Sequence, residues 1–248
     1  MLTQRFFIEL GYDGTAYSGW QRQPNARSVQ EVIETALSKI HGGMAIPLVG
    51  CGRTDAGVHA RFFVAHAALP IETDVVQLKH KLNKMLPCDI VIFRAYQVAD
   101  DMHARFQASS RTYRYYLHQE KDPFLKNSLF FVGKLDVDRM NEAARYLLGI
   151  QDFTSFSKLH TDVKTNFCTI TNAVWHSQGN QLYFEITADR FLRNMVRAIV
   201  GTLLEVGVGK IQPAEIPLII AAKDRSAAKL SVEARGLFLW DISYPVGT

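Results

Sequence analysis

The order of the patterned segments is the feature that most restricts the fold of this chain. Strand-like runs and amphipathic helices alternate along 248 residues, and no repetitive or Pro/Gly/Ser-rich stretch separates them. In a first round we predict strands at 6–10, 62–69, 90–95 and 111–118, with helices that begin after Ser28 and Asp74. In a second round we predict helices over 136–149, 191–206 and 214–222, and strands at 169–175, 182–188 and 236–244.

Strands separated by helices, together with a hairpin turn at 177–180, indicate the α+β class. We expect one mixed or antiparallel central sheet with helices packed against it. The doubled pattern predicts two similar halves that share this sheet, an N-terminal half over residues 1–107 and a C-terminal half over 108–248. A crevice between two such halves is where we expect the substrate to bind.

The composition excludes several classes of protein without identifying one. A hydrophobic content of 48% and a charged content of 21% are typical of a globular protein rather than a disordered one. The net charge of +4 favours a polyanionic partner only if basic residues gather in one place. Cys51, Cys88 and Cys168 are scattered, which disfavours a disulfide framework or a thiolate zinc site. With no signal-like start and no stretch able to span a membrane, we expect a cytoplasmic protein.

The most unusual local chemistry lies in the run GCGRTDAGVHA at residues 50–60. Its glycines permit sharp turns, and a cation, a hydroxyl and a carboxylate fall on three consecutive residues. Taken alone, Asp55 fits a surface turn, since Asp is a habitual turn residue. Two other interpretations remain open at this point: zinc ligation by Asp55, His59 and His66, and a nucleophilic Cys51. The first lacks a helical ligand spacing, and the second lacks a strand-to-helix context.

The run RTDAGVHA resembles the signature of the A-type tRNA pseudouridine synthases, and four further motifs extend the resemblance. They are GYDGTAYSGWQRQPNARSVQ at 11–30, HARFQASSRTYRYYL at 103–117, RFLRNMVRAIVGTLLEVG at 190–207 and RGLFLWDISYP at 235–245. The five motifs follow the order of the family and cover nearly the whole chain.

The resemblance implies that uridine is isomerised to pseudouridine at positions 38, 39 and 40 of the tRNA anticodon stem-loop. It implies Asp55 as the catalytic carboxylate, with no metal or organic cofactor. The carboxylate could add to the base, attack the sugar or remove a proton, and the sequence leaves these three roles open. The resemblance also implies tRNA as the partner, bound by a homodimer, with no DNA or membrane partner.

A guanidinium beside Asp55 would keep the carboxylate ionised and fix its direction. Arg53 lies in the same loop. Arg190, just before the predicted helix over 191–206, follows the spacing i, i+3, i+7 with Arg193 and Arg197, so the three are expected to form one stripe. The stripe alone fits a solvated helix face better than a site. Because Arg197 matches the arginine of the family motif FLxxMVR, we expect it to pair with Asp55. Arg53 is then expected to contact RNA or to position the loop, and Arg193 is expected to contact RNA.

Tyr113 lies in a strand where aromatic residues alternate with basic and hydroxyl residues. The resemblance implies that its ring stacks on the uracil, with a proton relay as a second possible role. Tyr115 and Tyr116 are expected to pack in the interior. Residues 102–118 contain no acidic residue but do contain Arg105, Arg111 and Arg114, so these arginines are predicted to bind phosphates.

Three rival functions remain to be separated from this one. The same reaction on another RNA is the nearest, and an RNA-binding module without catalysis belongs to a different class. RNA binding alone does not require an aligned carboxylate, which disfavours the RNA-binding module. A metal hydrolase that uses Asp55, His59 and His66 is the third.

Overall fold

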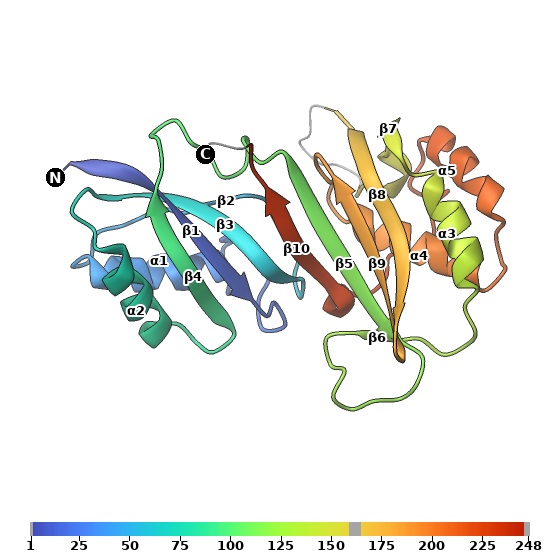
Figure 1. Cartoon of the computed structure of the whole chain (residues 1–248), viewed down its shortest axis with the longest axis horizontal. Helices are drawn as coiled ribbons and strands as arrows, with labels where there is room; N and C mark the ends of the chain where they lie inside the picture. The colour runs from blue at the N-terminus through green and yellow to red at the C-terminus, as the bar shows by residue number, and fades with distance from the viewer. Residues whose placement is uncertain (1, 159–164, 246–248) are drawn as a thin grey trace. The chain divides into compact units, whose positions relative to one another are not determined.

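The computed structural model describes residues 2–158 and 165–245 of the chain (Figure 1). Its contacts divide the chain into two compact units, residues 1–109 with 239–248 and residues 110–238. The sequence-based division at residue 107 assigned the closing strand to the C-terminal half. The contacts instead place residues 239–248 with the first unit.

Unit 1 contains a sheet with the strand order β4-β1-β3-β10, with the short β2 (Val49–Gly50) beside β3. β1 (Thr3–Tyr12) is antiparallel to both β3 (His59–Pro70) and β4 (Ile90–Gln97). Residues 239–243 of β10 (Leu237–Ser243) form its other edge. From Phe6 to Tyr12 every residue of β1 is buried, which identifies it as the central strand of this core.

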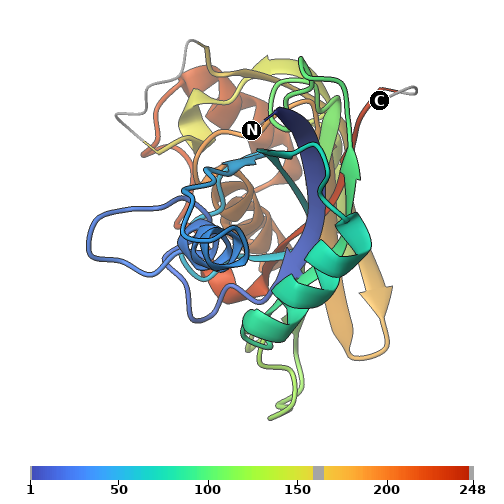
Figure 2. The same ribbon diagram turned by 90° about the vertical axis from the view of Figure 1, so that its left-hand side faces the viewer.

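Two amphipathic helices complete unit 1, and both begin where the sequence predicted. In α1 (Val29–Ile40) the Ser28 side chain accepts the Glu31 amide at 3.2 Å. In α2 (Val75–Met85) the Asp74 carboxylate accepts the amides of the second and third helical residues. α1 and α2 contact one another, and Figure 2 shows α1 end-on with α2 nearby.

Unit 2 contains an antiparallel sheet with the strand order β5-β9-β8-β7. Its strands are β5 (Ser110–His118), β9 (Gln181–Ala188), β8 (Phe167–Gln178) and β7 (Gly149–Asp152), and the short β6 (Leu129–Phe130) runs parallel to β5. β8 and β9 form the predicted hairpin, and Gly179 provides the left-handed backbone of its turn with a φ of 61°.

The helices of unit 2 are α3 (Val137–Arg145), α4 (Met195–Gly207) and α5 (Ile216–Ala222). Three short 3₁₀ turns accompany them: η1 (Thr154–Phe156), η2 (Pro213–Glu215) and η3 (Ala234–Gly236). Most residues of α4 are buried, so it is the core helix of this unit. A Cβ on Gly201 would lie 1.9 Å from the Leu230 carbonyl oxygen, so only a glycine allows α4 to pack this closely against that segment.

The α+β class predicted from the sequence is confirmed. The observed strands are mostly longer than predicted, and the helix predicted over 136–149 ends at Arg145. Within residues 2–158 and 165–245, no helix is long and apolar enough to span a membrane. The predicted cleft between the two halves stays a prediction.

Candidate active site

The Asp55 loop connects β2 to β3 in unit 1. The Cys51 amide donates to the Val64 carbonyl at 2.8 Å, which fixes the start of the loop on β3. The Val58 amide donates to the Asp55 carbonyl at 3.2 Å, and Gly57 between them has a φ of 76°. Asp55 therefore lies in a tight turn and is half-buried, whereas Arg53 is exposed.

Glycines of the 14–19 segment lie directly against the backbone of this loop. A Cβ on Gly14 would lie 2.0 Å from the Val58 carbonyl oxygen, and one on Gly19 would lie 2.3 Å from the Thr54 carbonyl oxygen. Gly19 also has a φ of 91°, a region that other residues rarely adopt. Two main-chain hydrogen bonds connect the same segments, from Trp20 to Thr54 at 3.4 Å and from Gly57 to Tyr17 at 3.2 Å. Backbone packed on backbone thus sets the position of Asp55.

A buried aromatic cluster supports the loop from inside the core. The Tyr12 hydroxyl and the Thr54 hydroxyl are hydrogen-bonded at 2.8 Å, and both residues are less than a tenth exposed. The Trp20 ring stacks on Phe63 with centroids 4.1 Å apart, and Tyr12 contacts both rings. Thr54, the residue before Asp55, is therefore held through its side chain as well as its backbone.

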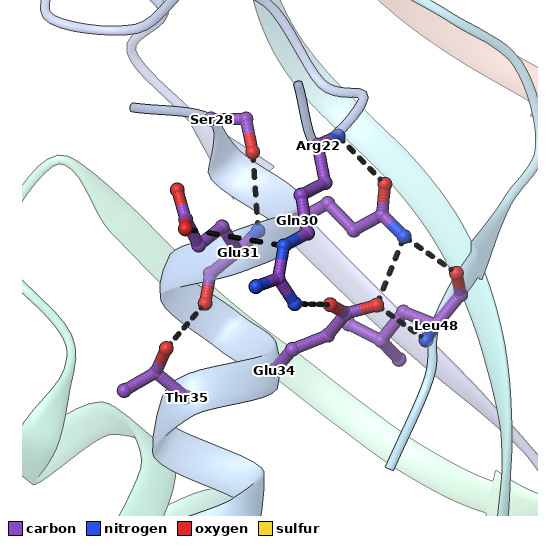
Figure 3. Close-up of polar contacts among 7 residues, drawn as sticks. All are labelled: Arg22, Ser28, Gln30, Glu31, Glu34, Thr35 and Leu48. Carbon is purple, nitrogen blue, oxygen red and sulfur yellow. Dashed lines mark hydrogen bonds and ion pairs between the residues drawn. The ribbon is translucent and has the colours of Figure 1, made fainter. Parts of the chain in front are cut away.

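Figure 3 shows a polar network on α1 that fixes the segments flanking the site. The Gln30 side chain accepts the Arg22 amide at 2.9 Å and donates to the Leu48 carbonyl at 3.0 Å. Glu34 accepts from Gln30 at 2.9 Å and from the Leu48 amide at 2.8 Å (Figure 3). The chain that enters the Asp55 loop through β2 is thus tied to the helix that follows the glycine segment.

The geometry gives no support to zinc ligation. His59 is 1% exposed, and its Nδ1 lies 3.1 Å from both the Gly14 amide nitrogen and an Asp13 carboxylate oxygen, so this nitrogen already has partners within the protein. His59 and His66 lie seven residues apart on β3, a span of roughly 20 Å along a strand. Among the residues that the structure describes, no group of three His, Cys, Asp or Glu side chains is arranged to hold a metal.

In unit 2, Tyr113 is half-buried on β5, and its ring meets Phe191 edge-on with centroids 5.1 Å apart. Tyr115 is fully buried, and its hydroxyl donates to the Glu233 carbonyl at 3.0 Å, which confirms the packing role predicted for it. Tyr116 contacts the Phe238 ring edge-on with centroids 5.5 Å apart. Tyr116, like Tyr113, is half-buried, so only the Tyr115 ring of the three is enclosed in the core as predicted.

Arg197 lies in the first turn of α4 and is half-buried. Its Nε donates to the Val232 carbonyl at 2.7 Å, and its own carbonyl accepts the Val232 amide at 3.2 Å. These two bonds hold both ends of the residue against one segment of unit 2. Asp55 belongs to unit 1, whereas Tyr113 and Arg197 belong to unit 2. Their convergence in one site stays a prediction.

The predicted helical stripe of three arginines is wrong. α4 begins at Met195, so Arg190 and Arg193 precede it and do not share its face with Arg197. Asn194 has a left-handed φ of 65° and donates to the Ser231 hydroxyl at 2.6 Å, so the backbone before Met195 cannot continue as a helix.

The other predicted RNA contacts already have partners within the protein. Arg114 forms an ion pair with Glu185 at 2.7 Å, and the Arg111 guanidinium donates to the Asp189 carbonyl at 2.8 Å. Arg105 and Arg193 are exposed. Phosphate binding by these arginines stays a prediction. Through their bonds to Glu185 and to the Asp189 carbonyl, Arg114 and Arg111 also connect β5 to β9 and to the residue after it.

Sequence reasoning missed the residues that hold the Asp55 loop. Tyr12, Gly14, Gly19 and Trp20 all lie in the segment at 11–30, whose residues suggest a family resemblance but not a role in holding Asp55. Its glycines were the available signal, since a glycine fits where another backbone approaches closely.

Comparison with known proteins gives a consistent result over nearly the full length. The sequence model of the tRNA pseudouridine synthase family matches residues 10–107 and 143–245. The chain is 56% identical over 246 residues to tRNA pseudouridine synthase A of Porphyromonas gingivalis, covering 97% of each chain. It is 52% identical to the protein of that name from Parabacteroides distasonis, covering 98% of this chain and 96% of that protein. It is 41% identical to the one from Bacillus subtilis, covering 97% and 99%.

Proposed function

Because this chain belongs to the family of tRNA pseudouridine synthases, we propose that Asp55 is the carboxylate with which it converts uridine to pseudouridine in tRNA. The reaction breaks the bond between N1 of uracil and C1′ of ribose and forms a bond between C5 and C1′. The hydrogen on C5 leaves to solvent and the freed N1 takes up a proton, so the product has the same mass as the substrate. One ionised carboxylate near the glycosidic bond can act as nucleophile or as base.

The observation that carries this proposal is the rigid presentation of Asp55. Its turn is packed against the backbone at Gly14 and Gly19, and the preceding Thr54 is hydrogen-bonded inside the core. An ordinary surface turn needs none of these supports. A carboxylate that must meet one atom of a substrate does, because small displacements of a catalytic group cost large factors in rate.

We assign Arg197 and Tyr113 to the same site. Arg197 would keep the Asp55 carboxylate ionised, since a nearby guanidinium favours the charged form. The partly exposed ring of Tyr113 would stack on the uracil once the base leaves its stem. Arg53 and Arg193, both exposed, would contact the RNA backbone.

The position of the modified uridines, the oligomeric state and the compartment are proposed from the resemblance of the sequence to the family. We propose that the modified uridines lie in the tRNA anticodon stem-loop, and that two copies of the chain act together. We also propose that the protein works in the cytoplasm and has no DNA partner.

Release of tritium from [5-³H]uridine-labelled, unmodified tRNA tests the proposal directly. The wild type should release tritium, and Asp55→Asn should release essentially none while it binds the same tRNA and unfolds at a similar temperature. Asp101→Asn, at an exposed position in the same unit, is the matched control and should remain active. Activity in Asp55→Asn would refute the role of Asp55. A wild type that binds tRNA but releases no tritium would favour the RNA-binding module instead.

A further inference from the structure

The turn at residues 102–107 in unit 1 exposes a large aromatic ring. Phe106 is 75% exposed, and the neighbouring Arg105 is also exposed. Two residues that precede this pair are buried, since Met102 is 6% and Ala104 is 0% exposed. The tip of the turn therefore points outward from a base that is fixed in the core.

Side chains from three distant segments hold the base of the turn. His66 on β3 accepts the Ala104 amide at 3.1 Å, and the Tyr244 hydroxyl donates to the Ala104 carbonyl at 2.7 Å. The Arg5 guanidinium donates to the Met102 carbonyl at 2.8 Å. Burial, with a smaller effect from Arg5, lowers the pKa of His66 to about 4. The imidazole is therefore neutral at neutral pH and can accept the amide hydrogen bond.

His103 then fixes the exposed tip itself. Its Nδ1 accepts the amides of Arg105 at 3.1 Å and of Phe106 at 3.3 Å. Its ring lies 4.2 Å from the Phe106 ring, centroid to centroid, and 4.7 Å from the His66 ring. One side of the Phe106 ring is thus supported by a second ring, while most of its surface faces solvent. Such rigidity around an exposed phenylalanine indicates a surface that binds something.

The charges near the ring indicate which kind of partner it fits. The Arg105 guanidinium carbon lies 5.7 Å from the centroid of Phe106, so an aromatic ring and a cation are presented together. Residues 102–118 contain no acidic side chain. An unpaired nucleobase offers a flat face for the ring, and its phosphate offers a charge for the arginine. A protein–protein interface needs roughly 800 Å² on each partner, far more than the roughly 200 Å² of one aromatic side chain.

We propose that Phe106 is a base-stacking residue, on which an unpaired base of the bound tRNA rests while Arg105 contacts a phosphate of the same strand. This proposal rests on the proposed function only in taking tRNA as the ligand. It assigns the ring a role in holding RNA, separate from the chemistry at Asp55.

Substitutions that separate an aromatic ring from mere apolar contact test the proposal. Phe106→Leu keeps an apolar side chain but removes the ring, and Phe106→Trp enlarges the ring. Phe124→Leu is the matched control, since Phe124 is 88% exposed and lies outside the two ranges that match the family model. Dissociation constants for unmodified tRNA are measured by filter binding at fixed salt, each variant in the Asp55→Asn background to prevent turnover.

Phe106→Leu should weaken tRNA binding by about 5- to 150-fold, whereas Phe106→Trp and Phe124→Leu should stay within about threefold of the parent. The fluorescence of the new tryptophan should also be quenched on tRNA binding, beyond any change from the three native tryptophans. Thermal unfolding of each variant checks that the turn still folds.

Parent-like tRNA binding by Phe106→Leu would overturn the proposal, as would an equal loss in Phe124→Leu. A shift in oligomeric state with tRNA binding unchanged would overturn it too, and would assign the ring to a protein interface. The wild-type tritium assay separates this inference from the proposed function. If the wild type is inactive but Phe106→Leu loses tRNA binding, the function fails and the stacking role stands.

Discussion

Gly19→Ala should displace the catalytic loop rather than merely destabilise the protein. The added Cβ would lie 2.3 Å from the Thr54 carbonyl oxygen, whereas ordinary contacts begin at 3.4 Å. The backbone beside Asp55 must therefore move by about 1 Å, a displacement that can lower a catalytic rate by about 100-fold. Left-handed strain of about 1–3 kcal/mol and overpacking of about 1–3 kcal/mol add to a loss of about 2–6 kcal/mol in unfolding free energy.

Gly43→Ala is the control that introduces left-handed backbone strain without displacing a neighbouring segment. Gly43 has the same φ of 91° as Gly19, but nothing lies within 4 Å of the Cβ that would be added. Both variants should lose stability, and only Gly19→Ala should lose turnover at saturating tRNA. Tritium release gives kcat below the melting temperature of each variant, and thermal unfolding gives the loss of stability. A folded Gly19→Ala that turns over as fast as Gly43→Ala would show that packing at Gly19 does not position Asp55.

Two further results follow from the described contacts. Arg197→Ala should reduce kcat for tritium release far more than Arg193→Ala, because Arg197 is half-buried and expected beside Asp55, whereas Arg193 is exposed. Equal losses would contradict the pairing of Arg197 with Asp55. Because the pKa of His66 is lowered in the folded protein, the unfolded chain binds more protons than the folded protein between pH 6.5 and about 4. The free energy of unfolding should therefore fall by up to about 3 kcal/mol as the pH is lowered through that range. His66→Gln, which keeps an acceptor but does not titrate, should flatten this pH dependence in denaturant titrations, and an unchanged slope would contradict the assignment.

The elements that depend on neighbouring residues could be predicted from the sequence. Ser28 and Asp74 each cap a helix through bonds that span two or three residues, and each helix begins where its cap predicts. The start of α4 could not be predicted in this way. Its position depends on Asn194, whose side chain bonds to Ser231, 37 residues away, while residues 191–194 themselves fit a helical pattern.

In the candidate site, too, the features set by neighbouring residues could be predicted and those set by distant residues could not. The chemistry of Asp55 is visible in the sequence because the motif places it among glycines with a cation and a hydroxyl. What holds it is not visible, because Tyr12 and Gly19 reach the loop from more than 30 residues away. The role of Phe106 could not be predicted either, since the sequence does not reveal that His66 and Tyr244 anchor the turn beneath it.

The return of the chain to unit 1 has a consequence for how the protein is made. The chain leaves this unit after Ser109 and rejoins it at Leu239, and Ser109 donates both its amide and its hydroxyl to the Ser243 carbonyl. During synthesis, residues 1–109 must therefore wait for more than a hundred further residues before the edge of β3 is covered by β10. Tyr244 arrives in the same late segment and completes the turn that carries Phe106. A chain that ends before this segment would lack the Tyr244 bond to the Phe106 turn, and its bare strand edge would be open to pairing with other chains.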